Sequence, residues 1–142
     1  MNIYNPEEMQ NFAIKVANKS KRGDIFCLEG ELSSGKTFFV KSFANFFGIK
    51  KISSPTFSFI NIYRNKKGLE IYHMDAYRIK SHNEANDVGF EDYFFSNGIC
   101  FIEWASKIKY IIPDFATWIY FEKKLNFNEF FRRVKIITKN KS

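Results

Sequence analysis

Apolar residues in the first part of the chain recur at the spacing of one buried helix face: Met9, Phe12, Ala13, Val16 and Ala17. Positions three or four residues apart lie on the same side of a helix, so the pattern predicts an amphipathic helix. Its start is indicated by the capping residue Asn5, followed by Pro6 at the first helical position and by Glu8 three residues after the cap. Gly23 is expected to end this segment.

A short apolar run over residues 25–28 predicts a strand that is buried on both faces. A second helical pattern runs from Lys36 to Phe47, and Gly48 is expected to end it. The residues of this helix that we expect to point into the core are Phe39, Val40, Phe43, Phe46 and Phe47.

The rest of the chain is predicted to form mainly strands. They are predicted over residues 56–63, 69–75, 99–103, 117–122 and 133–138. A turn over residues 64–68 is expected to join the first two as a hairpin, and short helical pieces are expected in the polar segment 81–92 and over residues 108–112. With no internal repeat and no long linker, the pattern predicts one α/β domain over residues 1–142, with a mixed central sheet flanked by helices.

Composition narrows the class of protein. The chain of 142 residues is long enough to bury a core without disulfide or metal staples. Cys27 and Cys100 both stand in apolar runs, where reduced core thiols are expected rather than a disulfide or zinc site. The N-terminus lacks the pattern of a signal peptide, and no apolar stretch is long enough to span a membrane. We therefore expect a soluble, cytoplasmic protein.

The candidate chemistry begins directly after the first buried strand. Residues 30–37, Gly-Glu-Leu-Ser-Ser-Gly-Lys-Thr, match G-x-x-x-x-G-K-[ST] between a predicted strand and a predicted helix. A chain of this composition contains such a match by chance only roughly 0.004 times. In this arrangement backbone N–H groups and the positive end of a helix surround one concavity, which suits a polyphosphate.

We assign nucleotide contacts to the loop and the start of its helix: Ser33, Ser34, Gly35, Lys36, Thr37 and Phe38. Lys36 is expected to reach the β- and γ-phosphates, and the Thr37 hydroxyl is expected to ligate Mg²⁺. A nucleotide with its cation Mg²⁺ is therefore the expected ligand, and the motif predicts that the domain is of P-loop NTPase type.

Hydrolysis needs an acid at the end of a strand beside the loop. Glu103 ends an unbroken apolar run, so it is favoured as the Walker B acid and a second Mg²⁺ contact, whereas Asp75 ends a run interrupted by polar groups. We expect Asp75 to support the site or position water, and Thr56, after Pro55, to sense the γ-phosphate. Solvated carboxylates at strand ends remain the alternative for both acids. If Glu103 proves structural, Asp75 takes its place.

Four blocks together resemble the TsaE (YjeE) family in order and spacing: residues 30–37, 54–57, 72–78 and 102–104. The resemblance extends from about Asn5 to the C-terminus. Members of this family are small bacterial P-loop ATPases needed to make threonylcarbamoyladenosine (t6A) in tRNA. The resemblance implies ATP hydrolysis with Mg²⁺ that is activated by TsaB and TsaD partners, with at most a weak or indirect contact to tRNA.

The resemblance also implies roles by position. Asp75 and Trp104 match positions that family members need for activity, so the implied catalytic set is Glu103, Asp75, Thr56 and Trp104. An arginine at Arg132 or Arg133 matches one near the base, and we place Arg133 in the nucleotide site. Ser33 stands where the family has glycine, so a positive φ at this position would strain the loop.

Other functions remain open but are less favoured. A small-molecule kinase lacks an Arg-rich lid, and a GTP switch lacks the acid of its guanine motif after Asn65 and Lys66. An RNA-binding module is suggested by the net charge of +7. However, the charge is polarised, because Lys and Arg predominate in residues 123–142 and are absent between Ser81 and Ser106. The basic end is either solvated or docks on an acidic partner or tRNA.

Overall fold

The computed structural model describes residues 1–56 and 58–138. Its elements, in chain order, are β1 (Asn2–Ile3), α1 (Pro6–Lys19), β2 (Ile25–Glu29), α2 (Lys36–Phe46), β3 (Ile60–Arg64), β4 (Glu70–Asp75), α3 (His82–Val88), α4 (Glu91–Phe94), β5 (Ile99–Glu103), the 3-10 helix η1 (Ala105–Ile111), β6 (Thr117–Asn126) and β7 (Glu129–Thr138). All of the strands belong to one sheet, in the order β1-β7-β6-β2-β5-β4-β3.

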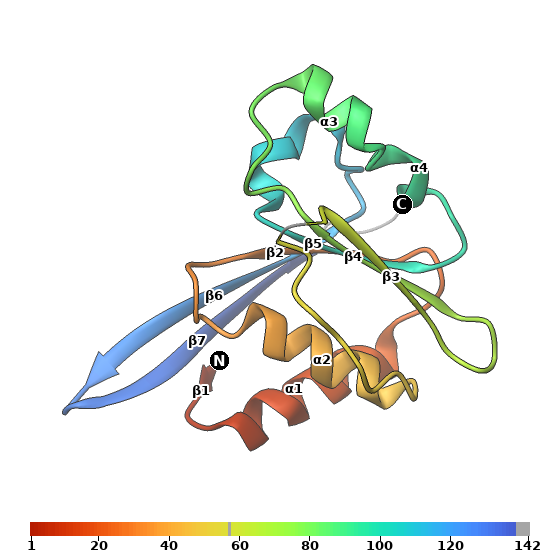
Figure 1. Cartoon of the computed structure of the whole chain (residues 1–142). Coiled ribbons are helices and arrows are strands. Elements are labelled where there is room, and N and C mark those ends of the chain that lie inside the picture. Colours follow the sequence, from red (N-terminus) through yellow and green to blue (C-terminus); the bar gives the residue numbers. More distant parts are fainter. Residues whose placement is uncertain (57, 139–142) are drawn as a thin grey trace.

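The centre of the sheet is parallel and its edges are antiparallel. Strands β6, β2, β5 and β4 run in the same direction, while β7 and β3 are antiparallel to β6 and β4. Helices α1 and α2 cover one face, and α3, α4 and η1 cover the other (Figure 1). This arrangement confirms the predicted α/β class with a mixed sheet flanked by helices.

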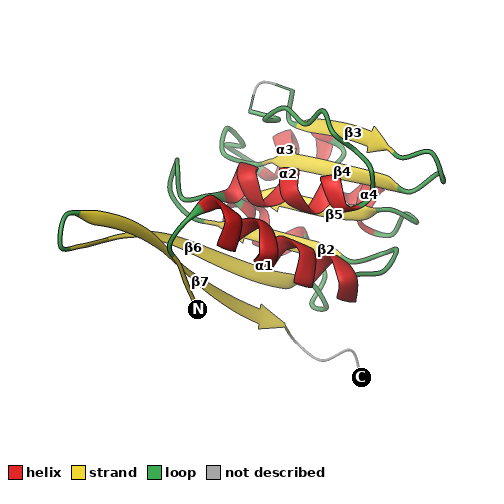
Figure 2. Ribbon diagram, turned by 90° about the horizontal axis from the view of Figure 1, so that it is seen from below, coloured by secondary structure: helices red, strands yellow, loops and turns green. Residues whose placement is uncertain are grey.

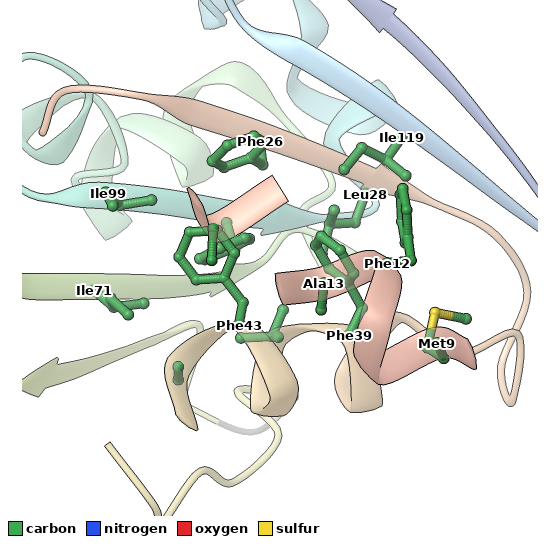
Figure 3. Packing of buried hydrophobic residues seen from close by; sticks show 14 of the residues in the cluster. Met9, Phe12, Ala13, Phe26, Leu28, Phe39, Phe43, Ile71, Ile99 and Ile119 are labelled. Atoms are coloured by element: carbon green, nitrogen blue, oxygen red, sulfur yellow. The ribbon is translucent and has the colours of Figure 1, made fainter. Parts of the chain in front are cut away.

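The core between the sheet and the α1–α2 face is rich in phenylalanine rings (Figure 3). The rings of Phe43 on α2 and Phe101 on β5 meet edge to face at 4.7 Å, and Phe26 on β2 stacks on Phe101 at 5.3 Å. Offset and edge-to-face pairs of this kind add roughly 0.5–1.5 kcal/mol each beyond the burial of their area. This packing holds α2, which follows the phosphate-binding loop, rigidly against the central strands.

The local signals for α1 and α2 were largely correct. Asn5 caps α1, because its Oδ1 accepts a hydrogen bond from the Glu8 backbone N–H at 2.8 Å. The prediction that Phe46 points into the core was wrong, since the side chain is 43% exposed. Phe47, four residues after the buried Phe43, packs on it at 5.4 Å, so Phe46 lies at the margin of the buried face.

Two predicted strands differ in extent. Strand β3 begins at Ile60 rather than at residue 56, because Phe59 has a positive φ of 64° and its backbone N–H donates to the Pro55 carbonyl. Residue 57, which belongs to this prediction and to the resemblance, lies outside the described residues. Strands β6 and β7 extend well beyond 117–122 and 133–138 and form a long hairpin that projects from the body (Figure 2). The outer part of this hairpin is formed by the pairing of β6 with β7 and buries few side chains. The sequence therefore carries no alternating apolar pattern there.

Both cysteines are free and buried, as expected. Among the residues that the structure describes, no helix has the length and apolar character needed to cross a membrane. The basic residues Lys139 and Lys141 lie outside the described residues. The other basic residues of this end of the chain, which include Lys123, Arg132 and Arg133, all belong to the β6–β7 hairpin.

Candidate functional site

The parallel strands bring three predicted site segments to one edge of the sheet. Strand β2 ends at Glu29 and continues into the phosphate-binding loop, and β5 ends next to it at Glu103. On the far side of β5, Asp75 at the end of β4 lies directly opposite Glu103 in the register. The carboxyl edge of a parallel sheet is where ligands bind in open α/β folds.

The phosphate-binding loop adopts a backbone conformation that only particular residue types tolerate. Gly30 has a φ of 152°, and a Cβ at this position would lie 2.5 Å from the Phe121 carbonyl oxygen, so no side chain fits. Gly35, at the N-cap of α2, has a φ of 110°. Ser33 has a φ of 67°, so the position at which the family has glycine does require the left-handed region, as the sequence comparison suggested.

Lys36 is enclosed at the start of α2. Its Nζ donates to the Gly30 carbonyl at 2.5 Å, lies 4.0 Å from Glu103 Oε1 and stands 4.1 Å from the centre of the Trp104 ring. Burial lowers the pKa of Lys36, while the nearby carboxylates of Glu103 and Asp75 oppose that shift. The amine therefore lies where the loop, the acids and the indole converge.

Glu103 is buried, and its second carboxylate oxygen contacts a side chain of β4. Nε2 of His73 lies 2.6 Å from Glu103 Oε2. The Glu103 carboxylate thus lies between His73 on one side and Lys36 on the other. A carboxylate at this position, held beside the loop lysine, has the placement that the Walker B assignment requires.

Asp75 and Thr56 also come together. Thr56 lies close enough to Asp75 to lower the pKa of its carboxyl group, and Asp75 Oδ1 accepts a hydrogen bond from the Tyr77 backbone N–H at 2.8 Å. Thr56 Oγ1 lies 2.7 Å from the hydroxyl of Ser54. Burial raises the pKa of Asp75, an effect that the Tyr77 N–H opposes and the neighbouring Glu103 increases.

Trp104 occupies a special backbone position between β5 and η1. Its φ of 59° is in the left-handed region, which a large side chain rarely adopts. The conformation turns the indole toward Lys36, and the ring of Tyr77 packs against the indole with the ring centres 5.0 Å apart. A strained residue at a cleft is a recurrent feature of functional sites.

A cavity of about 430 Å³ opens beside the loop. The predicted residues that line it are Ser33, Gly35, Lys36, Thr37, Phe38 and Glu103. Arg132 also lines the cavity and donates from Nη2 to the Ser33 carbonyl at 3.1 Å, whereas Arg133 is paired across the strand with Glu122 and is not part of the lining. Of the two arginines considered, the structure therefore places Arg132, and not the predicted Arg133, at the loop.

Sequence reasoning missed several residues of the site. Tyr4, Pro6 and Met9 line the same cavity, and His73 contacts Glu103. The N-terminal residues reach the cavity because β1 pairs with β7, so that Ile3 lies opposite Arg132. No local pattern signals such long-range pairing, whereas His73 stood inside a block that the resemblance already included.

The donor groups fit a polyphosphate with a hard cation. The Ser34 hydroxyl oxygen is buried at the loop without a hydrogen-bond partner among the described residues. The half-buried Thr37, the second residue of α2, lines the cavity. Oxygen ligands such as the Thr37 hydroxyl and the Glu103 carboxylate suit Mg²⁺. The helix N-terminus and the loop amides supply the complementary positive field for phosphate.

Fold and site together define a P-loop NTPase-type α/β domain, in which a glycine-bounded loop joins a central parallel strand to a helix. The family model described as "Threonylcarbamoyl adenosine biosynthesis protein TsaE" matches residues 3–133. The chain belongs to the TsaE family.

Individual relatives agree with this assignment. The tRNA threonylcarbamoyladenosine biosynthesis protein TsaE of Bacillus subtilis (strain 168) is 44% identical over 111 residues, which cover 78% of this chain and 68% of that protein. The protein of the same name from Rickettsia prowazekii is 42% identical over 108 residues, which cover 75% and 74%. The crystal structure of Bacillus subtilis YdiB matches with a TM-score of 0.78 at 34% identity, covering 98% of this chain and 84% of that one.

Proposed function

We propose that the chain binds and hydrolyses ATP with Mg²⁺ and acts in the t6A modification of tRNA. The observation that carries the proposal is the convergence of Lys36, Glu103 and Asp75 on the mouth of one phosphate-binding loop. Membership of the TsaE family supports the t6A role. Such a role places the chain in the cytoplasm.

Each side chain takes a defined part in this proposal. Lys36 leaves the Gly30 carbonyl and binds the phosphate oxygens as a point charge, while the loop amides fix their position. Thr37 and Glu103 hold Mg²⁺, which when bound neutralises charge on the β- and γ-phosphates. Asp75 and the neighbouring Thr56 orient the attacking water. The indole of Trp104 shields Lys36 from solvent.

The base is held in the same cavity, beside Tyr4 and Phe38. Phe38 and Tyr4 are exposed apolar rings in or beside the cavity wall, and Arg132 adds a cation near them. Rings of this kind stack on a base without reading its edge. ATP is preferred over GTP in this proposal, and competition binding of the two nucleotides tests that preference; a strong preference for GTP would contradict it.

Turnover is proposed to depend on TsaB-like and TsaD-like partner proteins. We therefore expect slow phosphate release by the chain alone and a marked increase when both partners, purified separately, are added with ATP and Mg²⁺. Lys36→Ala should abolish release in both conditions, and its melting profile should show that it remains folded. Rapid turnover by the isolated chain, unchanged by the partners, would contradict the partner dependence.

A weak contact with tRNA is supported by the outer part of the β6–β7 hairpin. Lys123 and Lys124 on β6 lie opposite Arg132 and Phe131 on β7, and Lys123 Nζ stands 4.4 Å from the Phe130 ring. Basic and aromatic side chains on one ribbon suit phosphates and unstacked bases. Binding of tRNA by the isolated chain should be weak and should fall steeply with salt; salt-independent binding would exclude this contact.

A further inference from the structure

The buried contact between His73 and Glu103 is not explained by nucleotide binding alone. His73 lies two residues before Asp75 on β4, so both side chains point to the same face of the strand, the face that Glu103 occupies on β5. The His73 side chain is fully buried, and Nε2 lies 2.6 Å from Glu103 Oε2. Within the described residues, this is the hydrogen bond that the Glu103 carboxylate makes.

The direction of the hydrogen bond follows from the surroundings of the ring. Nδ1 of His73 is buried and has no hydrogen-bond partner in the part of the chain that the structure describes. A proton on Nδ1 would bury an unpaired N–H and would turn the Nε2 lone pair toward a carboxylate oxygen. The ring therefore carries its proton on Nε2 and donates it to Glu103.

This contact determines which oxygen of Glu103 faces the phosphate site. Since Oε2 is held by His73, Oε1 is left on the side of Lys36, 4.0 Å from Nζ. A glutamate has three rotatable side-chain bonds, and Lys36 at 4.0 Å is too distant to fix them by a hydrogen bond. Without His73, the carboxylate could rotate away from the loop.

We propose that His73 is a positioning residue, which fixes the rotamer of Glu103 so that Oε1 faces the phosphate and cation site. The inference rests on the proposed function, because it takes Glu103 as the acid of the nucleotide site. His73 itself does not touch the nucleotide. It acts as the outer partner of a ligating carboxylate, a relationship whose loss typically costs about 10–100-fold in metal affinity or activity.

Three variants of His73 distinguish a residue that positions Glu103 from one that only fills space in the core. His73→Gln keeps an N–H donor at nearly the reach of Nε2, whereas His73→Leu fills a similar volume without a donor. His73→Asn keeps the donor on a shorter side chain that falls short of Glu103. His82, exposed on α3 and stacked on Tyr110 at 3.7 Å, provides the matched control His82→Leu, far from the loop in the sequence.

The first measurement needs no nucleotide. The chain has two histidines, so nitrogen-proton correlations of the imidazole rings in the full ¹⁵N-labelled chain can be assigned with His82→Leu alone. We expect the buried ring to carry its proton on Nε2, and Glu103→Ala to shift that resonance while leaving His82 unchanged. A proton on Nδ1, or an Nε2 signal that Glu103→Ala does not move, would overturn the proposal even if ATP proved not to be the ligand.

The second measurement compares ATP affinity by calorimetry with Mg²⁺ and with Mg²⁺ removed by a chelator. We expect His73→Leu and His73→Asn to lose about 10–100-fold of the Mg²⁺-dependent gain in affinity while Mg²⁺-free binding changes little, and His73→Gln to recover most of it. Thermal melts identify any variant that does not fold, and the Asn and Gln pair suffices if Leu fails. Equal Mg²⁺ dependence in Asn, Gln and wild type would overturn the proposal, whereas absence of ATP binding by the wild type would overturn the proposed function instead.

Discussion

Arg132 on β7 donates a hydrogen bond from Nη2 to the carbonyl oxygen of Ser33, 99 positions earlier in the chain, at 3.1 Å. Ser33 is the residue of the phosphate-binding loop whose φ of 67° lies in the left-handed region. The β6–β7 hairpin therefore supports the loop at the point where its backbone is strained. Backbone strain of this kind persists only where neighbouring contacts hold the backbone in place.

Replacement Ser33→Gly is expected to raise the free energy of unfolding by about 0.5–1 kcal/mol. Glycine adopts a positive φ without the cost of roughly 1–2 kcal/mol that other residues incur, although its freer unfolded chain cancels part of the gain. Urea unfolding monitored by fluorescence measures the change. Ser34→Gly in the same loop is the matched control, because Ser34 has no positive φ and its replacement should destabilise. Equal destabilisation by both variants would refute the strain argument.

Arg132→Ala is expected to weaken ATP binding by about fivefold, because one hydrogen bond worth about 1 kcal/mol no longer holds the loop carbonyl. Arg133→Ala is the control, since Arg133 lies opposite Glu122 and away from the cavity lining. Titration of a fluorescent ATP analogue at constant ionic strength compares the two variants, which change the net charge equally. A loss confined to Arg133→Ala would restore the sequence-based assignment.

The choice between these two arginines illustrates what the sequence could predict. The capped start of α1 at Asn5, the loop with Lys36, and Glu103 at the end of a buried strand were all visible because each has a local signature. Successive residues of a strand face opposite sides, so only the register of β7 decides that Arg132 faces Ser33. That register depends on the outer hairpin, whose polar residues carry no periodic signal.

The contact of His73 with Glu103 could not be predicted from the sequence, for a different reason. Its partner Glu103 is 30 residues away on the neighbouring strand, and only the parallel pairing of β4 with β5 brings the two together. A histidine in a buried strand is as readily a core residue as a functional one, so residue type alone does not reveal the contact. The same long-range pairing brings Tyr4 to the cavity through β1.

Asp75→Asn is expected to stabilise the folded chain at neutral pH. Burial raises the pKa of Asp75 above its ordinary value of 3.8, so the folded state binds the proton more tightly than the unfolded state does. The favourable contribution of the protonated group is complete below pH 3.8 and is lost as the pH rises through the higher folded pKa. Asparagine carries no charge to bury, and its Oδ1 can still accept from the Tyr77 N–H.

The pH dependence provides the check on Asp75. Free energies of unfolding of wild type and Asp75→Asn should differ most at about pH 7 and converge as the pH is lowered toward about 4. The variant should also lose ATP hydrolysis, because the proposal assigns the orientation of water to this carboxylate. A stability difference that is constant with pH would show that Asp75 is not responsible for the shift.

Phe127→Asn is expected to stabilise the outer part of the β6–β7 hairpin. Phe127 and Asn128 form its turn with φ values of 49° and 66°, and two-residue turns with both φ angles positive favour asparagine and glycine. The Phe127 ring is 93% exposed, so little packing is lost when it is removed. Relief of the left-handed strain should increase amide exchange protection in residues 123–132 by about 5–30-fold, which corresponds to roughly 1–2 kcal/mol.

Hydrogen exchange is the appropriate measurement because the outer hairpin projects from the body and can open without global unfolding (Figure 2). Amides of α2 should keep their wild-type protection, since they report the core around Phe43 rather than the turn. Phe130→Asn is the matched control: it removes a strand ring that contacts Lys123 at 4.4 Å and should lower protection in the same segment. Reduced protection in Phe127→Asn would mean that the exposed ring stabilises the hairpin despite its backbone strain.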